Sequence, residues 1–417
     1  MAIVILCCGT AIANASTTYG VFDARTMAMG GVAVASANND NAQFYNSALL
    51  AFNDEIEERT EDSRIWFPML SPQIARAVID AENIYSDDLH NALTRSVVAF
   101  NGAQDQTTAR DVANSSADLR GALQSIADRE LFVDVYAGIS LTEPGKFVGA
   151  GFFLGGRVLV SGMATITSAD LDLLNAYEEG LLFVASNGAE GRARPELFDA
   201  SGALIDPQGN YDSSVAAAGV TIIEVGVASA HQVEFLGQKI AAGWTFKAIN
   251  VRTFEDVQRL DNERVDLNRR EERDSAINFD LGAVKDFGNG WRVGVAIKDI
   301  IPHDYETTAG TRLKLRPRPR VGVSYQRGDW QFGADADLVT SQPLAGIKGV
   351  HEVAVGAEWV AKPWLRVRSG YRHDINGSRR GAVSVGVGTL WKRLAADIAF
   401  LNGSRSRGMS LQFGMAF

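Results

Sequence analysis

The chain has 417 residues, of which 46% are hydrophobic, and a formal net charge of −10. This acidic balance lacks the basic face that nucleic-acid binding requires, so we expect no direct nucleic-acid partner. The two cysteines are adjacent, Cys7 and Cys8, and no run of about 18 apolar residues predicts a membrane-spanning helix. If the N-terminus is removed, a disulfide framework and thiolate metal sites are excluded as well.

The first predicted element is a signal peptide. Residues 2–13 form a short apolar run, and Ala13-Asn14-Ala15 supplies a small-x-small cleavage pattern. This arrangement predicts a signal peptide over residues 1–15, cleaved after Ala15, although no Lys or Arg precedes the apolar run. A buried N-terminal strand is the alternative interpretation.

From about residue 131 onward, apolar and polar residues alternate with the period of β-strands. The clearest segment ends the chain, where Met409, Leu411, Phe413, Met415 and Phe417 alternate with small or polar residues. Similar patterns predict about fourteen strands in all, near residues 64–79, 131–141, 147–163, 215–229, 240–252, 275–286, 290–300, 318–327, 329–340, 350–360, 363–373, 381–390, 392–401 and the C-terminal segment.

The connections between these strands alternate in length. The long ones cover residues 80–130, 164–214, 253–274 and 301–317. Short periplasmic turns and long external loops are typical of transmembrane barrels, whose single-chain bacterial forms have an even strand number. We therefore predict an all-β transmembrane antiparallel β-barrel of about 14 strands in the outer membrane of a Gram-negative bacterium, with outer-membrane lipid around it.

Charged residues keep to one face of the predicted strands, which we assign to the lumen. The expected lumenal charge network consists of Asp280, Arg292, Asp335, Asp337, Glu352, Glu358, Arg366 and Arg368. A charge on the lipid face would cost roughly 2–4 kcal/mol at the middle of the bilayer, which explains the segregation. We expect Asp335 and Asp337 to pair with Arg366 and Arg368. Mixed signs on neighbouring strands favour a plugged barrel over an open pore.

The seven tryptophans give a separate indication of topology. Five of them lie in or beside predicted short turns, and Trp66 and Trp244 lie early in strands that rise from the same end. Aromatic residues concentrate at membrane–water interfaces, so we expect all seven at the periplasmic rim.

Helical patterns interrupt two of the long loops. Leu89, Leu93, Val97 and Phe100 form one stripe, with Ser86 as its expected N-cap. The other two helical patterns run over residues 112–126 and 168–177. We expect these helices to form a cap packed over the barrel mouth.

An unusual segment precedes the first strand. Its recognisable residues are Arg25, Met27, Met29, Gly30, Gly31, Phe44, Tyr45 and Asn46, and Ala48-Leu49-Leu50 follow. This stretch resembles the N-terminal signature of FadL-type outer-membrane barrels (OMPP1/FadL/TodX-like), and most closely their conjugal-transfer TraF-like branch. Residues 279–283, 291–294 and 298–302 are similar to that branch too. Ser47 departs from the pattern, because the family usually has Pro there.

The resemblance implies a barrel whose N-terminal segment folds into the lumen. It thus predicts a plug over residues 16–60 and a barrel over residues 61–417 that carries helical external loops at about 80–130 and 164–214. It also implies that a C-terminal aromatic, here Phe417 with Phe413 before it, is the signal that the barrel-assembly machinery reads.

No arrangement typical of an enzyme occurs in the sequence. None of the five histidines has a metal-ligand partner at the usual spacing, and a GxSxG elbow is absent. We expect no catalytic, cofactor-binding or metal site. Three non-enzymatic functions remain open: a component or accessory of plasmid conjugal transfer, a FadL-type channel for uptake of hydrophobic small molecules, and an outer-membrane scaffold for protein secretion.

Overall fold

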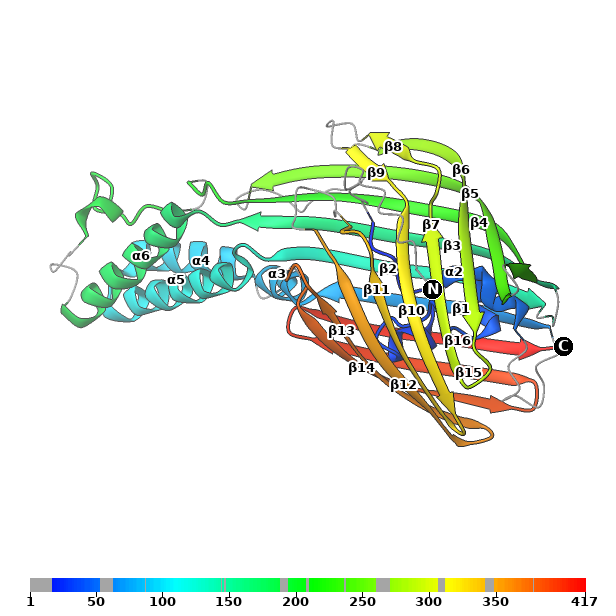
Figure 1. Cartoon of the computed structure of the whole chain (residues 1–417). Helices are drawn as coiled ribbons and strands as arrows, with labels where there is room; N and C mark the ends of the chain where they lie inside the picture. Colours follow the sequence, from blue (N-terminus) through cyan, green and yellow to red (C-terminus); the bar gives the residue numbers. More distant parts are fainter. Residues whose placement is uncertain are drawn as a thin grey trace.

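The computed structural model describes residues 17–52, 63–86, 88–143, 145, 148–187, 194–207, 210–235, 238–259, 271–306, 312–341, 349–377 and 379–417. The signal peptide predicted over residues 1–15 lies outside them. Fourteen strands form a closed barrel, and β1 pairs with β16 to complete it (Figure 1). The barrel strands are β1 (Arg64–Ala75), β2 (Glu130–Glu143), β3 (Val148–Thr165), β4 (Ser214–Phe235), β5 (Gln238–Arg259), β6 (Glu271–Asp286), β7 (Trp291–Lys298), β10 (Arg318–Arg327), β11 (Trp330–Asp337), β12 (Glu352–Lys362), β13 (Leu365–Asp374), β14 (Gly381–Trp391), β15 (Leu394–Gly403) and β16 (Ser406–Ala416).

Every neighbouring pair of barrel strands is antiparallel, as the predicted fold class requires. The predicted alternation in the last strand is confirmed. Met409, Phe413 and Met415 are exposed on the outside of β16, whereas Ser410 and Gln412 are fully buried on the inside. The barrel therefore presents an apolar outer surface and a polar interior, which is the arrangement of a barrel in lipid.

The two sides of the barrel differ greatly in height. The strands β4 and β5 have 22 residues each, whereas β7 and β11 have 8. A strand needs about 9–11 residues to cross a bilayer. The short side is thus barely long enough to span, and the tall side, from β2 to β6, extends well beyond the membrane at the end with the long loops.

Helices continue the tall side away from the barrel (Figure 1). They are α3 (Arg76–Ser86), α4 (Leu89–Ala103), α5 (Gln106–Ile126) and α6 (Ser168–Asn187), with a short helix η3 (Pro195–Leu197). Leu93, Phe100, Leu123, Leu174 and Leu181 share one buried core among them. No helix within the described ranges is long and apolar enough to cross a membrane.

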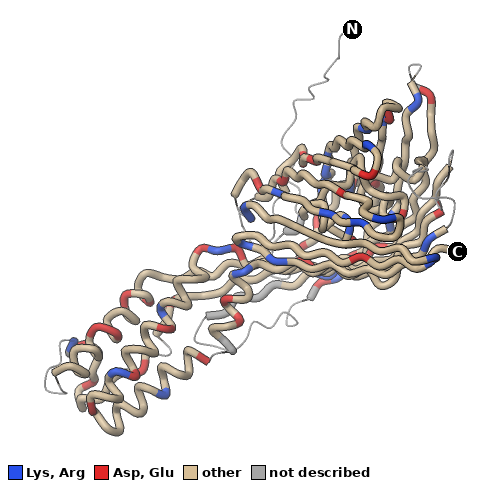
Figure 2. Tube along the Cα trace, turned by 90° about the horizontal axis from the view of Figure 1, so that it is seen from below, with Lys and Arg blue, Asp and Glu red and all other residues tan. Residues whose placement is uncertain are grey.

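Three expectations about this region were wrong. The helices project outward as an arm rather than packing over the barrel mouth, because the long strands carry them beyond it (Figures 1 and 2). The first strand ends at Ala75, and α3 follows at once. Ser86 is not the N-cap of the second helix, since it is the last residue of α3 and Asp88 holds the N-cap position of α4.

Six of the seven tryptophans form the predicted aromatic belt. Trp244, Trp291, Trp330, Trp359, Trp364 and Trp391 are all exposed on the outside of the barrel. Trp330 and Trp359 are cross-strand partners, and their rings stack 5.6 Å apart. Trp66 is the exception: it is buried and packs inside the barrel, where the pairing of β1 shifts register between Trp66 and Met69.

Residues 17–52, which we call the lumenal segment, fill the interior of the barrel. They form the short helices α1 (Ala24–Ala28), η1 (Asn39–Asn41), α2 (Ala42–Tyr45) and η2 (Ser47–Ala51), and nearly all of their residues are buried. The Asn46 side chain accepts a hydrogen bond from the Ala48 amide and starts η2. The turn is thus formed with Ser47 in place of the proline that the resemblance led us to expect.

The hairpin of β8 (His303–Glu306) and β9 (Arg312–Leu315) was not predicted. Within the loop at 301–317, these strands form a separate two-stranded sheet. Tyr305 and Leu315 bury against inward-facing residues of β3, β4 and β5, including Leu159, Val220 and Val251. The hairpin therefore folds back over the lumenal face of the tall side.

Candidate lumenal site and wall opening

The lumenal segment is attached to the short side of the barrel by charged hydrogen bonds. Arg25, which is 1% exposed, donates from Nε to Glu358 at 3.0 Å and from Nη2 to Gln331 at 2.6 Å. Arg368 donates to the same Glu358 oxygen at 2.5 Å and to Asp397 at 2.5 Å. Glu358 thus lies between an arginine of the lumenal segment and an arginine of the wall.

A second attachment is made by Asp335. Its Oδ2 atom accepts hydrogen bonds from the Ala33 and Val34 amides at 2.8 and 3.0 Å. The cation beside Asp335 and Asp337 is Arg320, at 3.5 and 3.0 Å, and not Arg366 or Arg368 as we expected. The reason is register, since Arg320 stands directly opposite Asp337 in the β10–β11 pair.

The remaining residues of the predicted charge network are spread around the barrel. Glu352 lies near Arg372 at 3.9 Å, and Asp280 belongs to a different cluster, described below. Arg292 pairs with Asp286 at 2.8 Å beside a short turn and lies over the Phe52 ring, 4.7 Å from its centroid. Arg366 is half-buried near the start of β13. The eight residues therefore do not form one network.

The other half of the recognisable N-terminal motif is aromatic. Phe44 packs against Phe22 at 5.6 Å and Phe153 at 4.9 Å between ring centroids. Tyr45 donates its hydroxyl hydrogen to Asp23 at 2.6 Å, and Asn46 donates to the Val34 carbonyl at 2.8 Å. These contacts join the two ends of the lumenal segment to each other and to β3.

The Met-x-Met-Gly-Gly part of the motif passes very close to the wall. Met27 and Met29 are fully buried, and Gly30 and Gly31 have φ angles of 74° and 99°, which favour glycine. A Cβ atom on Gly370 of β13 would lie 2.2 Å from the Met29 carbonyl carbon. Glycine on the wall is therefore what lets the backbone of the segment approach this closely.

A further charged cluster, which we had not predicted as a site, occupies the tall side. Lys247 is 1% exposed, and its Nζ atom lies 2.6 Å from Asp299, 2.9 Å from Asp280 and 3.5 Å from Glu224. Arg318 pairs with Asp299 and also donates to the Thr18 carbonyl at 2.5 Å. The sequence predicted an inward side only for Lys247, Asp280 and Glu224, and parity gives no information about which residues meet.

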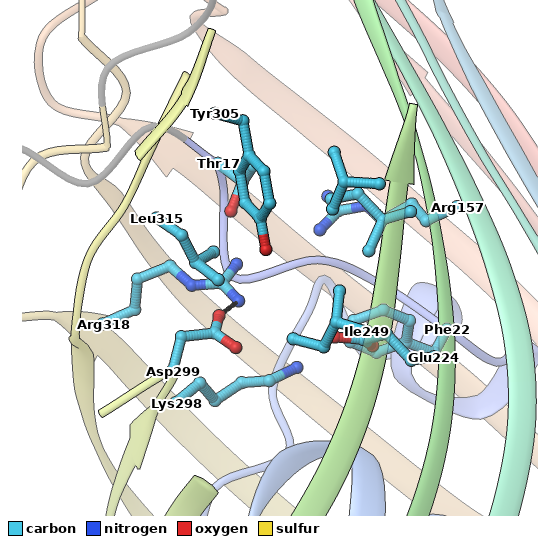
Figure 3. Close-up of a pocket in the computed structure, with 12 residues that line it drawn as sticks. Thr17, Phe22, Arg157, Glu224, Ile249, Lys298, Asp299, Tyr305, Leu315 and Arg318 are labelled. Atoms are coloured by element: carbon cyan, nitrogen blue, oxygen red, sulfur yellow. Dashed lines mark hydrogen bonds and ion pairs between the residues drawn. The ribbon is translucent and has the colours of Figure 1, made fainter. Parts of the chain in front are cut away.

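Beside this cluster lies a small cavity of about 20 Å³ (Figure 3). Its walls combine apolar residues of the hairpin and strands with charged ones, namely Thr17, Phe22, Arg157, Ile222, Glu224, Ile249, Val251, Lys298, Asp299, Tyr305, Leu315 and Arg318. In Figure 3 the Tyr305 hydroxyl points into the cavity, with Arg318 on one side and Arg157 on the other. That hydroxyl is buried and has no hydrogen-bond partner within the part of the chain that the structure describes.

The barrel wall is interrupted next to this cavity. The strand β6 begins at Glu271, but its ladder with β7 extends only from Leu281 to Asp286. Beyond Lys298 the chain leaves the wall to form the β8–β9 hairpin, and β10 starts again opposite Lys298. The Ile300 amide still donates to the Phe279 carbonyl at 3.0 Å. Among the described residues, 271–277 of β6 have no ladder partner on this side, and they border an opening in the wall.

Side chains cap the backbone at the edge of this opening. Asn278 donates to the Ile301 carbonyl and accepts from the Ile301 amide, both at 2.9 Å, and it also accepts from the Phe279 amide. Asp274 accepts from the Ser275 amide at 2.7 Å. Capped edge amides are one way in which a free strand avoids pairing with other chains, so the opening is compatible with a stable fold.

An apolar groove of about 720 Å³ lies outside the opening. Ile223, Val225, Ile277 and Ile301 line it and are exposed on the outer surface. Ile249 lines both this groove and the lumenal cavity. The wall between an outer apolar surface and the barrel interior is therefore thin at this place.

The predicted assembly signal is at the closing seam of the barrel. Phe413 and Phe417 are both exposed on the outside, and the Phe417 amide donates to the Ser63 carbonyl at 2.9 Å. The C-terminus lies at the end with the short turns (Figure 1).

A closed antiparallel barrel with an apolar outer surface, an aromatic belt and a filled polar lumen defines the class: this is a transmembrane β-barrel of the outer-membrane kind. Residues 43–337 match the family described as "F plasmid transfer operon, TraF, protein", which covers more than half of the chain. The chain belongs to this family.

Solved structures with a similar fold share little sequence with it. The Ralstonia pickettii toluene transporter TbuX matches with a TM-score of 0.49 and 11% identity over 95% of this chain and 98% of its own. A Pseudomonas aeruginosa FadL homologue has a TM-score of 0.49 and 10% identity over 97% and 99% of the two chains. No curated protein matches this chain.

Proposed function

We propose that this barrel conducts small, mostly apolar molecules through the opening in its wall, with the lumenal segment acting as a plug across the direct path. The observation that carries the proposal is that Ile249 separates the outer apolar groove from the lumenal cavity, where the β6–β7 ladder is interrupted. Ligand sites in proteins are mostly apolar with a few polar groups that fix orientation, and the outer groove has this composition, with Asn250, Ser275 and His303 as its polar residues.

The filled lumen favours a lateral route over a straight one. The lumenal segment is fastened to the neighbouring strands β11 and β12 of the short side, through Arg25 to Glu358 and through the Ala33 amide to Asp335. Its aromatic residue Phe44 packs against Phe153 of β3. A wide water-filled channel would leave these charges solvated instead of paired. On the tall side, by contrast, the apolar cluster of Ile222, Ile249, Val251, Tyr305 and Leu315 faces the cavity.

The proposal is tested by narrowing the groove. Ala248 lines it from β5, so Ala248→Trp fills it without adding charge. The matched control is Ala334→Trp, which places the same side chain on the outward face of β11, away from the opening. Entry of labelled toluene and of a labelled long-chain fatty acid is measured in cells that carry each variant. We expect Ala248→Trp to slow entry several-fold and the control to leave it unchanged; equal rates in both would refute the lateral route.

A second candidate, a role in plasmid conjugal transfer, is supported by the family description that matches residues 43–337. The arm that projects from the tall side offers a surface for other transfer components. Deletion of the gene should then lower the frequency of plasmid transfer between cells, and full-length protein should restore it. Unchanged transfer in the deletion strain would exclude this role and leave the channel proposal unaffected.

A further inference from the structure

We call residues 76–129 and 166–213 the external arm. Its helix α6 has two large apolar side chains outside the buried core of the arm. Leu174, Tyr177 and Leu181 point into the core of the arm and are almost completely buried. Leu182 and Phe183, on another face, are each 42% exposed. Most of the other exposed residues of α6 are polar, including Asp172, Glu179 and Ser186. An exposed apolar patch that is rimmed by polar residues marks an interaction site.

The external arm also carries the net charge of the whole protein. Its two segments hold 17 acidic residues against 7 basic ones, all of them arginine, which gives −10. The rest of the chain holds 33 acidic and 33 basic residues, so it is neutral. Figure 2 shows acidic positions along the arm helices.

Several arginines of the arm already have acidic partners. The ion pairs are Arg95–Asp88 at 2.6 Å, Arg129–Asp80 at 3.6 Å, Arg194–Glu179 at 2.7 Å, and Arg120–Glu178. The excess of carboxylates therefore gives the arm a negative field. Asp172, which is exposed on α6, lies on the same side of the helix as Leu182 and Phe183.

We propose that this face of α6, centred on Leu182 and Phe183, is a docking surface for a protein partner that has a basic rim around an apolar centre. Interfaces of this kind have a central apolar or aromatic anchor, and complementary charge steers the encounter. A second copy of the chain is not the expected partner, because its arm would bring the same negative charge against this face. A small molecule would need a concave site, whereas an exposed helix face is convex.

The position of the arm suits such a partner. The strands β3, β4 and β5 have 18, 22 and 22 residues, about twice the number that spans a bilayer, and they hold the arm beyond the membrane. The docking face is therefore separate from the groove and the cavity on which the channel proposal rests.

The test uses the full chain in lipid nanodiscs and two labelled synthetic peptides of equal length, an amphipathic Leu/Lys helix and its Leu/Glu counterpart. Binding is measured by fluorescence anisotropy at low and high salt. The variant is Leu182→Ser with Phe183→Ser, and the control is Val98→Ser, because Val98 is 66% exposed on α4. All three changes leave the charge as it is.

We expect the Leu/Lys helix to bind, the Leu/Glu helix not to bind, and the double variant to weaken binding about tenfold while the control does not. Equal loss in the control and the double variant, or equal binding of both peptides, would overturn the proposal. In cells, a photo-cross-linker in place of Phe183 should capture a basic protein whose purified form binds the wild-type arm and not the double variant. A cross-link to a second copy alone would overturn it as well.

Discussion

The Nε2 atom of His303 lies 2.9 Å from Oδ2 of Asp274, and this contact joins the start of the β8–β9 hairpin to the free edge of β6. The two residues are 29 positions apart, on opposite sides of the opening in the wall. Thr253 adds a second connection, because its hydroxyl donates to the Glu306 carbonyl at 3.1 Å. The hairpin is thus held to the tall side by a few polar contacts and by Tyr305 and Leu315.

Acid should loosen the hairpin. The hydrogen bond from His303 holds the pKa of the Asp274 carboxyl below its ordinary value of 3.8. A carboxyl whose pKa is lowered by folding stabilises the folded state fully at pH values above its pKa in the unfolded chain. This stabilisation is lost as the pH falls through the lowered pKa of the folded state. The mobility of a bimane fluorophore at Pro302→Cys should therefore rise below about pH 4. Adding Asp274→Asn should raise mobility at neutral pH and flatten its pH dependence; an unchanged profile would show that the pair does not hold the hairpin.

Removal of the Asp335 carboxylate should release part of the lumenal segment. Asp335→Ala leaves the amides of Ala33 and Val34 without their acceptor and Arg320 with one carboxylate fewer. Each buried donor left without a partner costs about 1–3 kcal/mol. The temperature at which the folded form is lost on a heat-modifiability gel should fall. Ser369→Ala is a suitable control, since its hydroxyl donates to another wall residue, the Ser384 carbonyl, at 3.2 Å. An equal decrease there would contradict a specific role for Asp335.

A methyl group on Gly370 should displace the lumenal segment. Its Cβ would lie 2.2 Å from the Met29 carbonyl carbon and 2.3 Å from the Gly30 amide nitrogen, and backbone atoms cannot rotate away. Gly370→Ala should raise the conductance of the barrel in planar bilayers. Gly156→Ala on β3, where a Cβ meets nothing within 4 Å, should leave conductance unchanged. Identical conductance of the two variants would mean that the close approach does not keep the segment in place.

The fluorescence of the six exposed tryptophans should show that they all lie at one membrane–water interface. Trp330 and Trp359 stack on the outer surface, and the other exposed tryptophans lie at the same end of the barrel. Lipids brominated close to the headgroup should quench their fluorescence more strongly than lipids brominated at the chain ends. Trp66, which is buried inside the barrel, should be protected from both. Stronger quenching by the lipids brominated at the chain ends would contradict the placement of these tryptophans at the interface.

Deletion of Phe417 should slow assembly more than it lowers stability. Its side chain is 56% exposed, and its amide makes a single backbone hydrogen bond across the seam to Ser63. The fraction of heat-modifiable protein in the outer membrane should fall soon after synthesis, while the protein that does assemble should unfold at nearly the wild-type temperature. Replacement of Leu411, which lies outward on the same strand, is the control for a general loss of apolar surface.

The sequence by itself determined the barrel, because the period-two alternation and the lengths of connections are local properties. It indicated fourteen strands, the outward side of β16, and the inward side on which Asp335, Glu358 and Arg368 lie. It also marked three of the four main arm helices through their stripes of apolar residues. Trp66 lies at the predicted end of β1, opposite Gly414, but it faces the lumen, because its inward parity was not considered.

Only the tertiary structure decided which charges meet and where the wall opens. Arg25 and Glu358 are 333 residues apart, and they come together because the lumenal segment folds inside the closed barrel. Arg320, rather than Arg366 or Arg368, pairs with Asp337 because the register of β10 against β11 places the two residues opposite each other. The opening follows from the different lengths of β6 and β7, and those depend on the hairpin that draws the chain out of the wall after Lys298. Alternation tells which face a side chain occupies, but contacts across a closed lumen depend on register and strand length, which no local pattern encodes.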